Sequence, residues 1–179
     1  MLAANRIGKT ESVGGYELAR HLTGIYPDWW PGHRFDRPIR AWAAGDTGQT
    51  TRDIVQAKLL GPADDRGTGL IPGANLGKMR PKSGIADAVD TVQVKHASGG
   101  WSRLGLKSYD QGRRTFQGTE QDVIWLDEEP PFDVYNECLI RTAATTPGER
   151  GGMIICTFTA LEGLSETVLY FLPGGELPP

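Results

Sequence analysis

The chain has few cysteines and histidines and no long apolar run. Only Cys138 and Cys156 occur among its 179 residues, and they form no CxxC pair. A disulfide framework is therefore not expected, and reduced thiols suit the cytoplasm. The three histidines, His21, His33 and His96, lack the spacing of metal ligands, so no zinc site is expected. No apolar stretch approaches the roughly 18 residues of a membrane span, and no secretory signal is visible.

A strong positive charge is also absent. The formal net charge is −3, whereas a protein that grips DNA across a whole face is usually basic. Local patches can still bind nucleic acid, and Lys78, Arg80 and Lys82 form a small basic cluster in an irregular segment. A loop that follows a phosphate backbone would use such residues, but a solvated loop is the commoner explanation.

The apolar periodicity alternates between helix and strand. Helices are expected at residues 9–23, 51–60, 132–144 and 164–171, where apolar residues recur with helical spacing. Strands are expected at 38–44, 123–126 and 152–158, with a hairpin formed by 91–96 and 101–106. Residues 61–90 are poorly periodic and predict either a long loop or a small insertion. This order predicts one α/β domain with a mostly parallel sheet flanked by helices. Ligands should lie at the carboxyl ends of its strands.

The first ten residues fit a phosphate-binding loop, the Walker A motif. Ala3, four further residues and then Gly8-Lys9-Thr10 match the pattern if Ala3 replaces the leading Gly. In such a loop the backbone N–H groups cradle the phosphates, Lys9 reaches the β- and γ-phosphates, and the Thr10 hydroxyl ligates Mg²⁺. Arg6 could offset charge on the γ-phosphate in the transition state. The nucleotide-binding positions expected from the motif are Ala3, Ala4, Asn5, Arg6, Ile7, Gly8, Lys9 and Thr10.

Two plainer interpretations stand beside this one. Residues 8–10 could be a helix start that contains a lysine by chance, and Arg6 an exposed loop cation. A phosphate-binding loop also needs a strand that enters it, and only Met1, Leu2 and Ala3 are available for that strand. We therefore expect that the N-terminal part of the domain is missing.

An apolar run that ends in acids supplies the second half of a Walker site. Residues 123–126 are followed by Asp127, Glu128 and Glu129. An Asp at the tip of a buried strand can hold Mg²⁺, as the Walker B Asp does, and the following Glu can orient or deprotonate a water. The alternative is an acidic helix start, with the carboxylates near the positive end of a helix dipole. Lys9 and Thr10 far upstream favour the catalytic interpretation.

A third segment ends in hydroxyl residues. The expected strand at 152–158 contains Thr157, and Thr159 follows closely. Next to the acidic strand, these hydroxyls could sense a γ-phosphate through a hydrogen bond. Ordinary β-branched strand composition is the alternative.

Together, the segments 3–10, 124–131 and 156–166 resemble motifs of the large terminase subunit of tailed bacteriophages. They occur in the order that this family shows, and residues 107–118 resemble the segment that precedes its acidic strand. The resemblance runs through most of the chain and thins between 61 and 90. It implies a P-loop NTPase fold of the ASCE type.

The resemblance also implies a function. The chain would be the ATP-hydrolysing motor domain of a DNA-packaging terminase, using ATP and Mg²⁺ to move double-stranded DNA into the procapsid. Its partners would be the phage portal protein and the small terminase subunit, in a homo-oligomeric ring within the bacterial cytoplasm and without a membrane. The implied roles are catalytic for Glu128, Arg6 and Lys9, metal-binding for Thr10 and Asp127, coupling for Thr157, Phe158 and Thr159, and a trans-acting finger for Arg113 or Arg114.

The chain also departs from the family pattern. The adenine-contacting segment expected upstream of the loop is not seen, and neither is the C-terminal nuclease domain, so 1–179 are expected to be a partial ATPase domain. Ala160 stands where a Pro is common. Two other functions stay open. A helicase- or recombinase-type ATPase shares the loop and the acidic strand, although residues 157–165 argue against it. The other is a catalytically inactive prophage fragment or a mispredicted gene start.

Overall fold

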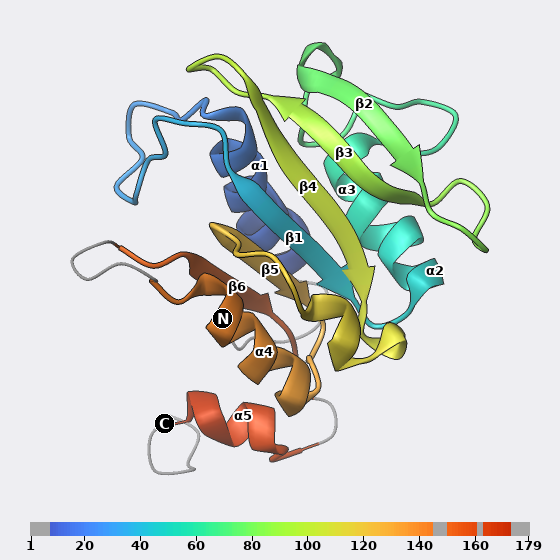
Figure 1. Ribbon diagram of the computed structural model, residues 1–179, viewed down its shortest axis with the longest axis vertical. Coiled ribbons are helices and arrows are strands. Elements are labelled where there is room, and N and C mark those ends of the chain that lie inside the picture. Colours follow the sequence, from blue (N-terminus) through green and yellow to red (C-terminus); the bar gives the residue numbers. More distant parts are fainter. Residues whose placement is uncertain (1–7, 145–149, 161–162, 173–179) are drawn as a thin grey trace.

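A computed structural model describes residues 8–144, 150–160 and 163–172. Within these residues, six strands form one sheet in the order β2-β3-β4-β1-β5-β6 (Figure 1). The strands are β1 (Arg40–Gly45), β2 (Leu76–Pro81), β3 (Val89–Lys95), β4 (Trp101–Ser108), β5 (Val123–Asp127) and β6 (Met153–Thr157). Strands β4, β1, β5 and β6 run parallel, and β2 and β3 are antiparallel to their neighbours. The predicted α/β fold with a mostly parallel sheet and a hairpin is confirmed.

The helices lie close to the predicted ranges. The first begins as the π-helical turn η1 (Lys9–Gly15) and continues as α1 (Tyr16–Thr23), and the second runs through α2 (Gly48–Thr50), η2 (Thr51–Gln56) and α3 (Ala57–Leu60). The remaining helices are α4 (Phe132–Thr142), α5 (Glu166–Phe171) and the short turns η3 (Gly73–Asn75), η4 (Tyr109–Gln111) and η5 (Arg113–Phe116). Gly24 ends α1 with φ of 67°, a left-handed conformation that glycine adopts without strain.

Alternating side chains divide the core into two layers. On β5, Val123 and Trp125 pack with α1 and α3 on one face, whereas Ile124 and Leu126 pack with α4 and α5 on the other. Successive strand residues point to opposite faces, and every residue of β5 is buried. Figure 1 shows α1 and α3 on the far side of the sheet and α4 on the near side. Asp127 continues the alternation of Trp125 and so lies on the α1 side.

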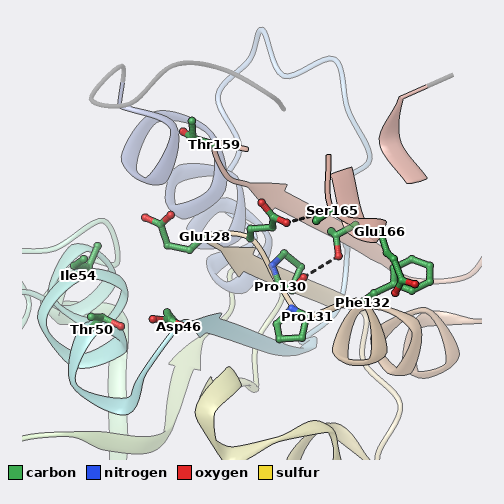
Figure 2. A pocket seen from close by; sticks show the side chains of 12 residues that line it. Asp46, Thr50, Ile54, Glu128, Pro130, Pro131, Phe132, Thr159, Ser165 and Glu166 are labelled. Carbon is green, nitrogen blue, oxygen red and sulfur yellow. Dashed lines mark hydrogen bonds between the residues drawn. The ribbon is translucent and has the colours of Figure 1, made fainter. Parts of the chain in front are cut away.

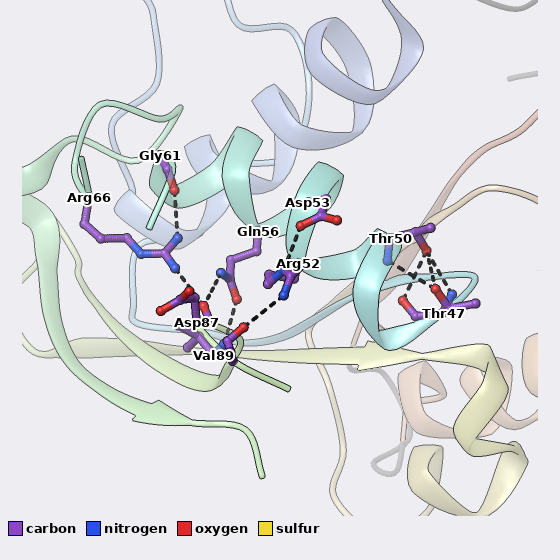
Figure 3. A network of polar contacts seen from close by, with 10 residues as sticks. Thr47, Thr50, Arg52, Asp53, Gln56, Gly61, Arg66, Asp87 and Val89 are labelled. Atoms are coloured by element: carbon purple, nitrogen blue, oxygen red, sulfur yellow. Dashed lines mark hydrogen bonds and ion pairs between the residues drawn. The ribbon is translucent and has the colours of Figure 1, made fainter. Parts of the chain in front are cut away.

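The segment 61–90 is more ordered than the sequence indicated. It contains the edge strand β2, which pairs with β3 through an irregular register. Polar contacts hold the loops on both sides of β2 (Figure 3): the Gln56 amide donates to the Asp87 carbonyl at 2.9 Å and accepts from the Val89 N–H at 2.6 Å, and Arg66 donates to the carbonyls of Gly61 and Asp87. Of the two alternatives expected for this segment, the long loop is therefore wrong for residues 76–81, which form a strand.

This corrects the placement of the basic cluster. Lys78 and Arg80 lie exposed on β2 rather than in an irregular loop, and Lys82 follows the strand. Sequence reasoning missed β2 because Gly77 and Pro81 interrupt it and its apolar side chains are few. No helix in the described part of the chain is long and apolar enough to cross a bilayer.

Candidate active site

Three segments that are far apart in sequence meet at the carboxyl end of the sheet. β5 ends at Asp127, its neighbour β6 ends at Thr157, and these two residues are paired in register. The helical turn η1 begins at Lys9 and contacts both strands. The described parts of the loop helix, the acidic strand and the hydroxyl-bearing strand thus meet at one end of the sheet.

Two threonine hydroxyls bind the Asp127 carboxylate. The Thr10 hydroxyl donates to Oδ1 at 3.0 Å and lies 3.3 Å from Oδ2, and the Thr157 hydroxyl donates to Oδ1 at 2.7 Å. Asp127 and Thr157 are each only 2% exposed. A buried carboxylate is stable when such hydrogen bonds replace its lost hydration. The two hydroxyls thus hold the carboxylate in a fixed orientation.

A buried tryptophan, Trp125, contacts the Thr157 hydroxyl. The indole N–H of Trp125 donates to the Thr157 hydroxyl at 2.8 Å, and its side chain is fully buried. Sequence reasoning missed this contact, because a tryptophan within an apolar run is typical of core packing.

Glu128 follows Asp127 in an unusual conformation. Its φ is 64°, one of two positive φ values among the described non-glycine residues, and its N–H donates to the Thr157 carbonyl at 3.1 Å. Such a left-handed conformation is rare outside glycine, asparagine and aspartate, and strained residues of this kind cluster at functional sites. The Glu128 side chain is exposed.

The Glu128 carboxylate faces a cavity of about 750 Å³. Figure 2 shows the carboxylate pointing toward the helical segment that carries Thr50 and Ile54. Across the cavity, Ser165 donates to the Glu129 carboxylate and Thr167 donates to the Pro130 carbonyl at 2.9 Å. The lining residues are Asp46, Thr50, Ile54, Glu128, Glu129, Pro130, Pro131, Phe132, Thr159, Ser165, Glu166 and Thr167. Acidic groups dominate the charge of this cavity.

A second residue that sequence reasoning missed holds the turn between Asp127 and Glu128. The Tyr109 hydroxyl donates to the Asp127 carbonyl at 2.9 Å and lies 3.4 Å from the Glu128 carbonyl. Burial raises the pKa of Tyr109 well above its usual value, and nearby thiols and carboxylates add to the effect. The phenol therefore stays protonated and acts as a donor. It belongs to the segment 107–118 noted in the sequence, but nothing in that segment singled it out.

The family model for the N-terminal part of the T4-like phage large terminase subunit matches residues 1–174 of this chain. The chain belongs to the large terminase family. It is 36% identical to the large terminase subunit of Salmonella phage P22 over 191 residues, a match that covers 96% of this chain and 37% of that protein. The chain thus spans 37% of the length of this relative.

Solved terminase structures share the fold. The large terminase ATPase domain of Thermus phage P74-26 superposes with a TM-score of 0.56 at 16% identity, covering 93% of this chain and 60% of that one. A large terminase from a thermophilic bacteriophage, solved in complex with ADP, gives a TM-score of 0.50 at 18% identity, covering 88% of this chain and 31% of that one. The fold prediction is confirmed by these neighbours.

The three residues expected to form the terminase coupling motif point in different directions. Thr157 contacts Asp127, whereas Phe158 is 2% exposed in the core against Phe171 of α5. Thr159 lines the cavity beside Glu128. The segment therefore connects the carboxylate, the cavity and α5, and its coupling role stays a prediction.

The two arginines considered as trans-acting fingers differ in their surroundings. Arg113 Nε lies 3.0 Å from a carboxylate oxygen of Glu137, whose side chain is 4% exposed and also meets Arg141 at 3.2 Å. Arg114 is exposed on the same turn, η5. Arg113 is thus engaged within its own chain, and the trans-acting role of either arginine stays a prediction.

Several predicted site residues cannot be placed. Ala3, Ala4, Asn5, Arg6 and Ile7 lie outside the described residues, and so does the side chain of Lys9. Gly8 is described: its φ is 80° and its carbonyl accepts from the N–H groups of Ser12 at 2.7 Å and Glu11 at 3.1 Å. This left-handed glycine opens η1, as expected where a loop turns into a helix. The roles of the other loop residues stay predictions.

Proposed function

We propose that this chain is the ATP-hydrolysing motor domain of a phage DNA-packaging terminase. The observation that carries the proposal is the contact between Thr10 and Asp127, a hydroxyl and a carboxylate delivered by the loop helix and the acidic strand. Membership of the terminase family supports the packaging role. The relative from Salmonella phage P22 is a large terminase subunit, and the structural neighbour from the thermophilic bacteriophage binds ADP.

The donor set fits Mg²⁺. This ion is usually held by one or two carboxylates together with substrate phosphates and waters, and Thr10 and Asp127 would supply one hydroxyl and one carboxylate. Within residues 8–144, 150–160 and 163–172, no group of three or more His, Cys, Asp and Glu gathers as an all-protein metal cage. When bound, Mg²⁺ would neutralise charge on the β- and γ-phosphates. Thr10 would turn its oxygen to the ion while its proton stays directed at Asp127.

Glu128 would act on the attacking water. Its carboxylate faces the cavity, one residue beyond the proposed metal ligand, where it could accept a hydrogen bond from the water and align it with the γ-phosphate. Tyr109 and the Thr157 carbonyl hold the main chain of this turn. The site would thus fix the direction of Glu128 through its backbone, before nucleotide binds.

The loop would bind the phosphates. Backbone N–H groups of residues 3–10 would cradle them, with Lys9 on the β- and γ-phosphates and Arg6 on the γ-phosphate. Thr157 to Thr159 would relay the state of the site to α5, because Phe158 packs on that helix. Arg114 of one subunit would complete the site of the next in a homo-oligomeric ring.

Membership of the family supports a proposal for the partners. They would be double-stranded DNA, the portal protein and the small terminase subunit, in the cytoplasm of the bacterial host. The basic side chains of Lys78 and Arg80 on β2 are candidates for contact with the DNA backbone.

The test is ATP turnover and nucleotide binding by the chain and three variants. Glu128→Gln should abolish turnover and spare binding, and Lys9→Ala should weaken both. Glu120→Gln is the matched control, because Glu120 is an exposed carboxylate just before β5, at the opposite end of that strand. Turnover that survives in Glu128→Gln would overturn the mechanism. A wild-type chain that binds no nucleotide would support the inactive-fragment alternative, and ATP-driven strand separation would support the helicase-like one.

A further inference from the structure

Trp125 contacts all three elements of the proposed site. It lies on β5 two residues before Asp127, its indole N–H binds Thr157 of β6, and its ring lies against Gly14 of η1. A Cβ atom added to Gly14 would lie 2.0 Å from the indole nitrogen and 2.4 Å from its neighbouring ring carbon. The helix that carries Thr10 therefore approaches the strand so closely only because residue 14 has no side chain.

The hydrogen bonds form a chain with a fixed direction. An indole nitrogen can only donate, so the Thr157 oxygen must accept from Trp125. The single Thr157 proton is then free to donate to Asp127, which as a carboxylate can only accept. Trp125, Thr157 and Asp127 are buried, where such bonds are strong and an unmade one is costly.

We propose that Trp125 is a positioning residue for the Mg²⁺-binding carboxylate. Its N–H fixes the rotamer and proton direction of Thr157, which in turn fixes Asp127, and its ring sets the spacing between Asp127 and Thr10. This inference rests on the proposed function and adds a residue to its site. Trp125 touches neither metal nor nucleotide and acts through its neighbours.

The expected magnitude follows from comparable sites. Partners that orient a metal-binding carboxylate typically change metal affinity by about 10–100-fold when removed. Trp125 is one hydrogen bond further from the Asp127 carboxylate than Thr157 is. The loss of its N–H should therefore weaken the Mg²⁺-dependent part of nucleotide binding by about tenfold, at the lower end of that range. Binding measured without Mg²⁺ should not change.

The experiment is calorimetric titration of ADP, with Mg²⁺ and with EDTA, into the whole chain. Trp125→Phe removes the N–H and keeps a ring, and Trp42→Phe is the matched control. Trp42 is a core tryptophan of the adjacent strand β1 that packs on the opposite face against Phe116. Trp125→Phe should weaken Mg²⁺-dependent binding, whereas Trp42→Phe should leave it unchanged.

A double variant separates positioning from general loss of packing. Thr157→Val removes the hydroxyl that Trp125 acts through, so adding Trp125→Phe to it should cost no further Mg²⁺ affinity. Thr157→Ser keeps the hydroxyl and should retain most of the affinity. Non-additivity is expected when two residues act through one hydrogen-bond chain.

A spectroscopic measurement checks the bond itself. The chain has five tryptophans, and Trp125→Phe identifies its indole peak in a ¹H–¹⁵N spectrum. Thr157→Val should move that peak upfield, because its hydrogen bond is lost. An unmoved peak, equal effects of Trp125→Phe and Trp42→Phe, or full additivity with Thr157→Val would each overturn the positioning role while the proposed function stands. A wild-type chain that binds no Mg²⁺–ADP would instead overturn the proposed function, and this inference with it.

Discussion

The Thr10 hydroxyl lies 3.0 Å from Oδ1 of Asp127, although 117 positions separate the two residues. Thr10 comes from the first helical turn and Asp127 from the tip of a buried strand. The fold therefore delivers a hydroxyl and a carboxylate to one point at the carboxyl end of a parallel sheet, where ligands of such sheets bind. The function proposed for this terminase chain depends on the contact between Thr10 and Asp127.

The first prediction concerns Tyr109. Tyr109→Phe removes the hydroxyl that donates to the Asp127 carbonyl, and one buried hydrogen bond contributes about 1 kcal/mol. We expect the free energy of unfolding in urea to fall by about that amount. Tyr16→Phe, at a half-buried ring in α1, should change it by much less. Equal effects of the two substitutions would show that the phenol does not support the turn.

The second prediction separates Arg113 from Arg114. Arg113→Ala leaves the buried Glu137 carboxylate with Arg141 alone. Because the Arg113 side chain is half-exposed, the loss of its ion pair should lower the free energy of unfolding by about 0.5–1 kcal/mol. Arg114→Ala should leave stability unchanged and reduce ATP turnover only in the assembled ring. Thermal unfolding and turnover of assembled motors measure the two effects. Stability loss in Arg114→Ala, with none in Arg113→Ala, would reverse the assignment.

The third prediction concerns the two thiols. Burial raises the pKa of Cys138 and of Cys156 to about 12, from an ordinary value of 9.0. Since the pKa is higher in the folded state, the stability from the neutral thiols is fully present below pH 9.0 and is lost as the pH rises toward 12. At pH 8, alkylation by iodoacetamide should be slower in the folded than in the unfolded chain by about a hundredfold or more. Equal rates would contradict the burial of these residues.

Part of the fold and of the site could be predicted from the sequence. The apolar run 123–126 predicted the strand, and the acids that follow it predicted carboxylates at the carboxyl end of that strand. Both could be predicted because a short buried strand and a following carboxylate are local features. The end of the helix predicted at residues 9–23 is local in the same way, because a glycine, Gly24, follows it directly. The edge strand β2 was missed, since its apolar residues Leu76 and Met79 are few and only partly buried against the core.

The contacts of the site could not be predicted in the same way. Trp125 reaches Thr157 across 32 positions, and Tyr109 reaches Asp127 across 18. Both contacts depend on which strands are neighbours and on the direction of each side chain. A tryptophan in an apolar run and a tyrosine after a strand are ordinary core residues until the sheet order is known. The left-handed Glu128 had no local signal, because glutamate seldom adopts that conformation.

The most direct test of the central claim is Mg²⁺-dependent ATP binding by the wild-type chain and by Asp127→Asn, which keeps the size of the side chain and removes its charge. Calorimetric titrations with Mg²⁺ and with EDTA give the metal-dependent part of the affinity. We predict that Mg²⁺ tightens ATP binding to the wild-type chain and that Asp127→Asn loses this gain, while binding in EDTA stays the same. A wild-type affinity that does not depend on Mg²⁺, or an Asp127→Asn variant that keeps the full gain, would contradict the account.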